Sequence, residues 1–237
     1  MANEYSKSWF EIFMNNKSSF ENKLEAEFIM RNAPVLSYKT VLDLCCGQGR
    51  HSKILADNGY DVIGIDRNTD ALECAKKYCH NNSATFVQHD MRDIESLNQR
   101  FNVIISMWQS FGYFDDVVNR NIIGQVSRCL LENGIFILDI YNKSCYENNI
   151  GIRKYNKNGI EVVSEVKKDG DRFNVKLNYD NDEKTSEEFN WRLYTKDEII
   201  NICKEVGLKC KIGCTWCDES KPIDNNSVRM QLVFEKQ

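Results

Sequence analysis

Short apolar runs alternate with amphipathic stretches between residues 40 and 141. The apolar runs that read as buried strands are 40–46, 60–66, 84–90, 101–108 and 134–141. The stretches with helical spacing between them are 50–59, 69–82 and 117–130. Strands separated by helices of this length join as parallel crossover units, so the pattern predicts a doubly wound, mostly parallel sheet.

The first 33 residues have a helical pattern of their own. The members of its apolar stripe are Trp9, Phe10, Phe13, Phe20, Leu24 and Phe28. Pro34 ends the pattern, because proline cannot continue a helix from this side. We therefore expect one packing helix that leads into the first strand.

The pattern changes near residue 143. From 152 to 194 polar and apolar residues alternate, and the turn sequences NKNG and KKDGD interrupt them, as in an antiparallel meander. A helix is predicted next at 195–207, where Thr195 and Glu198 have the spacing of a capping box. Two closing antiparallel strands, LKCKIGCTW and SVRMQLVFEK, complete the chain.

The expected fold class is therefore α/β. A doubly wound, mostly parallel, seven-stranded sheet would carry an inserted antiparallel β meander. The expected domains are a cofactor-binding α/β domain formed by 1–142 and 194–237, and an inserted lid and substrate subdomain at 143–193.

Composition narrows the classes of partner. The net charge is −4, which argues against nucleic acid, since affinity for a polyanion is dominated by phosphate neutralisation. No window approaches the roughly 18 consecutive apolar residues of a membrane span, and the N-terminus lacks the features of a signal peptide. We expect a cytoplasmic protein without a membrane partner, whose ten cysteines are buried thiols rather than disulfides.

A glycine pair follows the first predicted strand in VLDLCCGQGR. Glycines between a strand and a helix let the backbone approach a ligand at the positive end of the helix dipole. A dinucleotide fingerprint needs three glycines, and here Gly47, Gly49 and Ser52 occupy those positions. The serine disfavours an NAD-dependent oxidoreductase.

Aspartates stand at or near the ends of the first three predicted strands. Asp66 can accept hydrogen bonds from ribose hydroxyls, and Asp90 can accept one from an exocyclic amine, with Met91 against a purine ring. Together with Asp43 they would share the carboxyl edge of a parallel sheet, where ligands bind. Each aspartate alone is equally consistent with a helix cap.

Other candidate sites carry weaker signals. CKIGCTWC has the spacing of an iron–sulfur loop, but its alternation puts Cys210 and Cys214 on one face of a strand, which favours buried thiols. The histidines lack the spacing of a zinc site, so no metal is expected. A serine hydrolase is disfavoured because the sequence has no G-x-S-x-G elbow.

These motifs together resemble the class I S-adenosylmethionine-dependent methyltransferases. VLDLCCGQGRH, VIGIDRN and VQHDMRDI are similar to the first three motifs of that family, and FNVIISMWQSFGYF and GIFILDIYN to its fourth and fifth strand segments. SFGYF and DNNSVRMQLVFEK resemble a bacterial small-molecule subgroup with the DLCCGxGRH motif. The resemblance implies a Rossmann-like sheet and S-adenosyl-L-methionine as cofactor.

The resemblance also implies residue roles. The implied cofactor contacts are Asp43, Cys45, Gly47, Gly49, Arg50, Asp66, Arg67, Asp90, Met91 and Met107. The family has glycine where this chain has Cys45, and a Cβ there is expected to confine the backbone to negative φ. The candidate substrate contacts at the same sheet edge are Ser110, Phe111, Tyr113, Tyr141, Ser227 and Arg229. Phe111 and Tyr113 are equally consistent with core packing.

The implied function is transfer of a methyl group to a small-molecule acceptor by in-line displacement, in a monomer or homodimer. Placement of the acceptor dominates such a reaction, so a general base is optional. Tyr113, Tyr141 and His51 are candidates for a catalytic role, and no base is assigned. The alternative is a non-catalytic S-adenosylmethionine-binding sensor or partner subunit.

Overall fold

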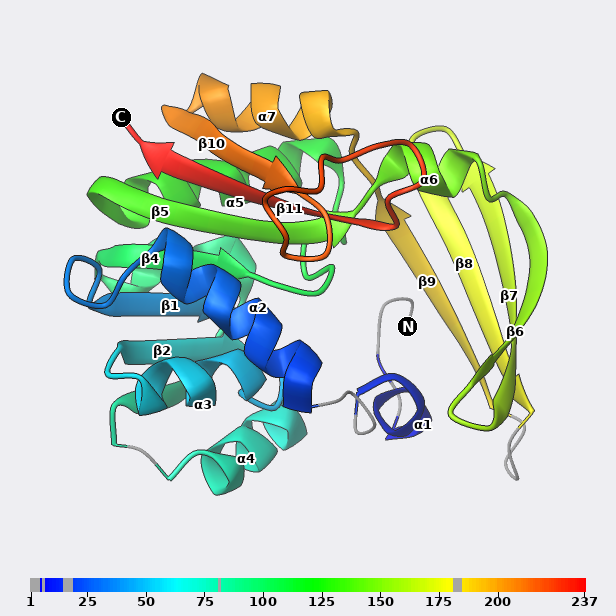
Figure 1. The fold of residues 1–237 in the computed structure, drawn as a ribbon, viewed down its shortest axis with the longest axis horizontal. Coiled ribbons are helices and arrows are strands. Elements are labelled where there is room, and N and C mark those ends of the chain that lie inside the picture. The colour runs from blue at the N-terminus through cyan, green and yellow to red at the C-terminus, as the bar shows by residue number, and fades with distance from the viewer. Residues whose placement is uncertain (1–4, 6, 15–18, 81, 181–184) are drawn as a thin grey trace.

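The computed structural model describes residues 5, 7–14, 19–80, 82–180 and 185–237 (Figure 1). A seven-stranded sheet has the order β10-β11-β5-β4-β1-β2-β3. Its strands are β1 Thr40–Leu44, β2 Asp61–Asp66, β3 Ala84–Gln88, β4 Phe101–Ser106, β5 Leu130–Tyr141, β10 Leu208–Cys214 and β11 Arg229–Lys236. Strands β1 to β5 are parallel, and β10 and β11 are antiparallel to their neighbours, which confirms the predicted fold class.

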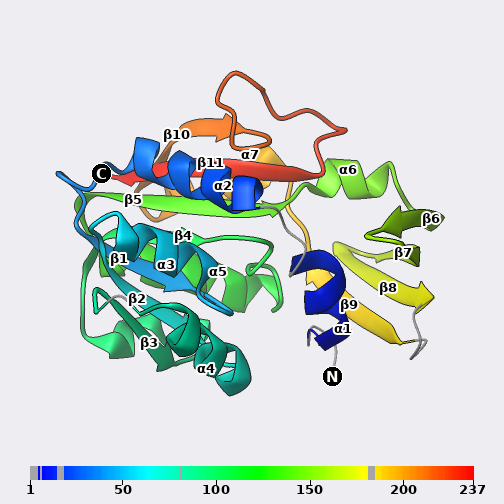
Figure 2. The ribbon, with the colours of Figure 1, turned by 60° about the horizontal axis from the view of Figure 1, so that its bottom comes forward.

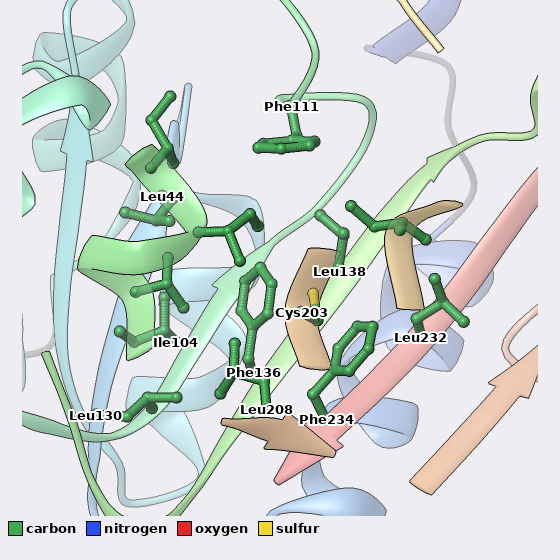
Figure 3. Close-up of a cluster of buried hydrophobic side chains, with 14 of the residues drawn as sticks. Leu44, Ile104, Phe111, Leu130, Phe136, Leu138, Cys203, Leu208, Leu232 and Phe234 are labelled. Carbon is green, nitrogen blue, oxygen red and sulfur yellow. The ribbon is translucent and has the colours of Figure 1, made fainter. Parts of the chain in front are cut away.

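Helices cover both faces of this sheet. The helices of this part are α2 Ser19–Asn32, α3 Arg50–Asp57, α4 Thr69–Tyr78, α5 Asp116–Cys129 and α7 Lys196–Glu205, with the 3₁₀ turn η2 Met91–Leu97. On one face α5 and α7 bury Ile123 and Ile199 in a cluster with residues of the sheet. Figure 3 shows Cys203 of α7 in this cluster, with Phe136 and Phe234 of the sheet. On the other face α2 and α3 bury Phe28 and Leu55. Each such side chain contributes about 1.5–3 kcal/mol through burial.

The strand order reverses at β1, which lies between β2 and β4. Loops that leave neighbouring strands at such a point diverge to opposite faces and leave a crevice at the carboxyl ends of the strands. The glycine loop after β1 and the loop after β4 both open onto this crevice.

A second sheet faces the carboxyl edge of the first. Its four antiparallel strands are β6 Gly151–Lys157, β7 Ile160–Asp169, β8 Arg172–Asp180 and β9 Ser186–Arg192, preceded by the short helix α6 Lys143–Glu147. Figures 1 and 2 show the N-terminal turn α1, Lys7–Trp9, between the two sheets. Ile12 belongs there to the same apolar cluster as Phe189 and Trp191 of β9, and Trp9 packs against this cluster.

The prediction of one N-terminal helix is wrong. Helix α1 passes into a π-helical turn, Phe10–Met14, and α2 spans Ser19–Asn32, with residues 15–18 outside the described part. The two segments bury their apolar side chains in different clusters, Ile12 in that of the second sheet and Phe28 in that of the first. Phe20, counted in the predicted stripe, is 71% exposed.

The expected face of Cys210 and Cys214 is also wrong. A register shift between Cys210 and Ile212 inserts one residue into β10, and this reverses the alternation beyond it. Cys210 therefore packs with the α5–α7 face of the sheet and Cys214 with the α2–α3 face. Among the described residues, no helix is long and apolar enough to cross a membrane.

Candidate active site

A cavity of about 770 Å³ lies at the carboxyl edge of the seven-stranded sheet. Its lining comes from the N-terminal segment, the loops after β1 to β4 and the ends of those strands. The lining residues are Tyr5, Trp9, Asp43, Cys45, Cys46, Gly47, Gln48, Arg50, His51, Asp66, Arg67, Asn68, Ala71, His89, Asp90, Met91, Met107, Trp108, Ser110, Tyr113 and Phe114. Most of the predicted site residues are thus brought together in one place.

The glycine loop after β1 contributes backbone to the cavity. Gly47 has φ +54°, and a Cβ added there would meet no atom within 4 Å, so its bare backbone faces open space. Gly49 has φ +74°, and its Cβ would lie 2.9 Å from Ala75 and Phe86, which makes glycine a packing requirement. Gly47 thus permits close approach of a ligand, and Gly49 permits close packing of α3.

Cys45 departs from the conformation expected of it. Its φ is +57°, in the left-handed region that the sequence argument reserved for glycine. The side chain lies in the cavity wall, where its Sγ is 3.6 Å from Sδ of Met91. The loop therefore keeps the glycine conformation although the residue is a cysteine, and this contradicts the expected negative φ.

Asp43 is a buried carboxylate at the base of the cavity, 2% exposed. Ser52 Oγ donates a hydrogen bond of 2.6 Å to its Oδ2. Burial raises the pKa of Asp43 to about 7, although the Ser52 hydrogen bond and the charge of Arg50 oppose the rise. The carboxyl group is consequently poised to gain or lose its proton near neutral pH.

The other two predicted aspartates hold backbone at the strand ends. Asp66 accepts hydrogen bonds from the amides of Gly47, at 2.9 Å, and Asn68, at 2.8 Å. Asp90 caps the 3₁₀ turn η2 and pairs with Arg92, which holds the pKa of Asp90 below its usual range. The capping interpretation is therefore correct for Asp90, and both side chains also line the cavity.

A buried carboxylate on α2 binds three residues of the cavity wall. Glu25 Oε2 lies 2.9 Å from His51 Nε2 and 3.4 Å from an Arg50 nitrogen. Glu25 Oε1 accepts a hydrogen bond of 2.6 Å from Trp108 Nε1. Arg50 also lies over the Trp108 ring, 5.3 Å from its centre. Helix α2 thus fixes this wall, although its residues are remote in sequence.

Aromatic residues form the end of the cavity nearest the second sheet. Tyr5 and Tyr113 are joined by a hydrogen bond of 2.9 Å between their hydroxyls. Burial raises the pKa of both phenols well above the ordinary value, so they stay protonated at neutral pH. Trp9, Phe114 and the more polar Ser110 line the same cavity.

Some predicted site residues do not line this cavity. They are Gly49, Phe111, Tyr141, Ser227 and Arg229. Phe111 is 2% exposed and lies in the α5–α7 core (Figure 3), 5.6 Å from the ring of Tyr194. Tyr141 packs against Tyr146 and Trp191 at ring distances of 5.1 and 5.2 Å.

Ser227 and Arg229 have structural partners. Ser227 closes a turn with Asp224, to which its hydroxyl donates at 2.8 Å. The Arg229 guanidinium lies 3.9 Å from the centre of the Trp108 ring and pairs with buried Asp139. Arg229 therefore supports the cavity wall from behind.

Sequence reasoning missed several lining residues. Gln48, His89 and Trp108 are each adjacent to a residue that was selected, so extending each motif by one position would have found them. Tyr5 and Trp9 carry no such signal, because tertiary packing alone brings the N-terminus to the cavity. Among the described residues, no group of three or more His, Cys, Asp or Glu is arranged to hold a metal ion.

Known proteins are similar in sequence to part of this chain. Residues 41–134 match a family model described as a methyltransferase domain. The putative methyltransferase YqeM of Bacillus subtilis (strain 168) is 32% identical over 106 residues, which are 43% of this chain and 42% of that protein. The glycine/sarcosine N-methyltransferase of Aphanothece halophytica is 26% identical over 150 residues, 60% of this chain and 57% of that protein. The chain spans about half the length of these relatives.

The whole fold has solved counterparts. An S-adenosylmethionine-dependent methyltransferase from Clostridium acetobutylicum ATCC 824 superimposes with a TM-score of 0.80 at 18% identity, and the match covers 96% of each chain. The fold is therefore that of S-adenosylmethionine-dependent methyltransferases, with the second sheet included in the match.

Proposed function

We propose that the chain is an S-adenosylmethionine-dependent methyltransferase that acts on a small-molecule acceptor. The main support for the proposal is the set of residues that line the cavity. One end is formed by bare glycine backbone and carboxylates at the carboxyl edge of the sheet, and the other by aromatic side chains. The first end suits a nucleoside with an amino-acid tail, and the second suits an acceptor with an apolar face.

The proposed cofactor contacts follow from the lining. Both oxygens of Asp66 receive a backbone N–H, and a carboxylate has about four lone-pair sites, so Asp66 retains capacity for two ribose hydroxyls. Asp90 and Met91 would contact the adenine. Asp43, the backbone at Gly47 and the Arg50 guanidinium would face the methionine moiety. These residues suit the group, because Gly47 offers backbone with open space beside it.

The protein's proposed contribution to the reaction is placement. S-adenosylmethionine would supply a methyl group already activated by its sulfonium. Tyr113 and Ser110 would orient the acceptor for in-line attack, an arrangement that can contribute up to about 7–11 kcal/mol through proximity. The raised pKa values of Tyr5 and Tyr113 argue that these phenols act as neutral hydrogen-bonding groups and not as bases.

Residues 143–193 are proposed to be the acceptor wall and lid. The second sheet follows β5 and so leaves the main sheet at its carboxyl edge. Its strand β8 reaches the loop after β4, since Arg172 donates to the carbonyl oxygens of Phe114, at 2.7 Å, and Tyr113, at 3.1 Å. A change in the sheet would thus be transmitted to the acceptor end of the cavity.

The test is a transfer assay with the full chain. The protein is incubated with S-adenosylmethionine carrying an isotopic methyl group and a metabolite extract. We expect label in one or a few small molecules, with S-adenosylhomocysteine formed in equal amount. Binding of the cofactor without transfer to any extract would favour the non-catalytic sensor, and label in added protein or nucleic acid would contradict a small-molecule acceptor.

A further inference from the structure

The chain turns a strained corner where β4 leaves the sheet. Trp108 and Gln109 are consecutive and both have left-handed backbone, with φ of +60° and +57°. Neither is glycine, so each is conformationally costly and persists only where its surroundings hold it. The corner begins the segment 107–114, which contributes Met107, Trp108, Ser110, Tyr113 and Phe114 to the cavity lining.

Asp139, near the end of β5, holds the backbone of this corner. Its Oδ2 accepts a hydrogen bond of 3.2 Å from the amide of Trp108. Its carbonyl oxygen accepts another, of 3.1 Å, from the amide of Gln109. The Gln109 side chain then donates to the carbonyl of Phe111, at 2.9 Å, and accepts from the amide of Tyr141, at 2.5 Å. Both left-handed residues are thereby tied to β5.

Arg229, at the start of β11, connects this backbone anchor to the Trp108 ring. Arg229 Nε donates a hydrogen bond of 3.0 Å to Asp139 Oδ1, and the guanidinium lies over the Trp108 ring, 3.9 Å from its centre. Gln231 Nε2 donates 2.8 Å to the same Asp139 oxygen. On the other side Glu25 accepts from Trp108 Nε1 and lies 3.6 Å from an Arg229 nitrogen. Ring and backbone of Trp108 are therefore held by one connected set of charges.

We propose that Asp139 and Arg229 are positioning residues, which hold the Trp108–Gln109 corner and so place the segment 107–114 for the acceptor. This inference rests on the proposed function. It replaces direct substrate contact by Arg229, since the guanidinium lies behind Trp108 and not in the lining. Asp139 is fully buried, which matches an action through Trp108.

The test uses Arg229→Met, which keeps an unbranched chain of similar length but removes the charge and the planar guanidinium. The matched control is Lys236→Met on the same strand β11. The Arg229 and Lys236 side chains are similarly buried, 19% and 15% exposed, but Lys236 donates to the carbonyl of Leu130 at the opposite edge of the sheet. A general loss of strand stability would affect both variants.

Three readouts separate positioning from stability. Transfer of isotopic methyl into the metabolite extract should fall about tenfold or more in Arg229→Met, because small misplacements of reacting groups have effects of that size. Affinity for S-adenosylhomocysteine, measured by calorimetry, should stay within about threefold of that of the unchanged chain. A change in the placement of the acceptor lowers the rate of transfer and leaves binding of the cofactor product almost unaltered. Lys236→Met should leave both quantities unchanged.

The third readout reports on the corner itself. In a chain with Trp9, Trp191 and Trp216 replaced by phenylalanine, Trp108 is the remaining tryptophan. Adding Arg229→Met should make its fluorescence several-fold more accessible to acrylamide. If Arg229→Met does not fold, Arg229→Lys keeps a charge beside Asp139 but loses the planar stack, and the same changes are expected in weaker form.

Two outcomes would overturn the inference: unchanged transfer in a folded Arg229 variant, or equal loss of transfer and of S-adenosylhomocysteine affinity. Failure of the proposed function would give a different result in the transfer assay. In that case the unchanged chain itself transfers no label, and the accessibility of Trp108 still decides whether Arg229 holds the corner.

Discussion

Ser52 Oγ donates a hydrogen bond of 2.6 Å to Oδ2 of Asp43, from the position where a dinucleotide fingerprint has its third glycine. The serine is fully buried. A glycine at this position would have no side chain, whereas the Ser52 hydroxyl stabilises the Asp43 carboxylate. The departure from the dinucleotide pattern therefore has a structural use. Ser52 lies in the first turn of α3, and its hydroxyl links that turn to Asp43 at the base of the cavity.

Asp43 should make stability depend on pH with the sign opposite to that of a salt-bridged carboxylate. Its pKa rises from 3.8 to about 7 on folding, so the folded chain binds more protons than the unfolded chain between these values. The contribution of Asp43 to the free energy of unfolding is then greatest below the unfolded pKa and is lost as pH rises through about 7. Relative to Asp43→Asn, the unchanged chain should lose about 4 kcal/mol over that range in denaturant titrations, since one pKa unit corresponds to about 1.4 kcal/mol. Equal pH profiles for the two chains would contradict the raised pKa.

Ser52→Ala should raise the pKa of Asp43 further, because the hydroxyl favours the ionised form. The measurement is the carboxyl ¹³C shift of Asp43 as a function of pH. A midpoint that stays in place or moves down would show that Ser52 does not stabilise the charge.

Cys45 should tolerate only residues that accept a left-handed backbone. Cys45→Ala and Cys45→Val both lose the contact with Met91, but the β-branched side chain fits φ +57° poorly. We expect Cys45→Val to be about 1–2 kcal/mol less stable than Cys45→Ala in urea titrations. Equal stabilities would mean that the loop rearranges at no cost.

Asp66→Ala should weaken binding of S-adenosylhomocysteine by about 1.5–3 kcal/mol, the usual range for hydrogen bonds to a charged group. The matched control is Asp61→Ala at the other end of β2, where the side chain is exposed and lies 3.9 Å from Lys39. Calorimetry should show a loss in the first variant alone. Unchanged affinity in a folded Asp66→Ala chain would remove Asp66 from the site.

Arg172→Met tests the proposed role of residues 143–193 as acceptor wall. The substitution removes both hydrogen bonds from β8 to the carbonyls of Tyr113 and Phe114. Methyl transfer should fall while affinity for S-adenosylhomocysteine stays within a few fold. Lys176→Met on the same strand removes an exposed ion pair with Glu188 and should behave like the unchanged chain. Loss of transfer in both variants would point to the stability of the sheet instead.

The regular part of the fold was predictable because local patterns and tertiary packing agree there. Each parallel strand is an apolar run between helices, and the capping box of Thr195 and Glu198 forms as expected. The carboxylates of Asp43, Asp66 and Asp90 were predictable for the same reason. Parallel strands end at one edge, so residues at three strand ends meet without further information.

The predictions that the structure contradicts concern features that depend on contacts between residues remote in sequence. The bulge in β10 leaves no mark in the alternation of LKCKIGC, yet it sends Cys214 to the other face. Cys45 has a left-handed backbone conformation, which cysteine rarely adopts, because the shape of the loop requires it. The helix stripe of residues 9–28 is divided between two clusters because a second sheet, formed far along the chain, takes up its first half.

The central claim is that the cavity at the carboxyl edge holds S-adenosylmethionine, and titration calorimetry with its stable product tests it most directly. We predict that S-adenosylhomocysteine binds with one molecule per chain, while NAD, injected under the same conditions, gives no saturable heat. Absence of S-adenosylhomocysteine binding by the folded chain, or preference for NAD, would contradict the account.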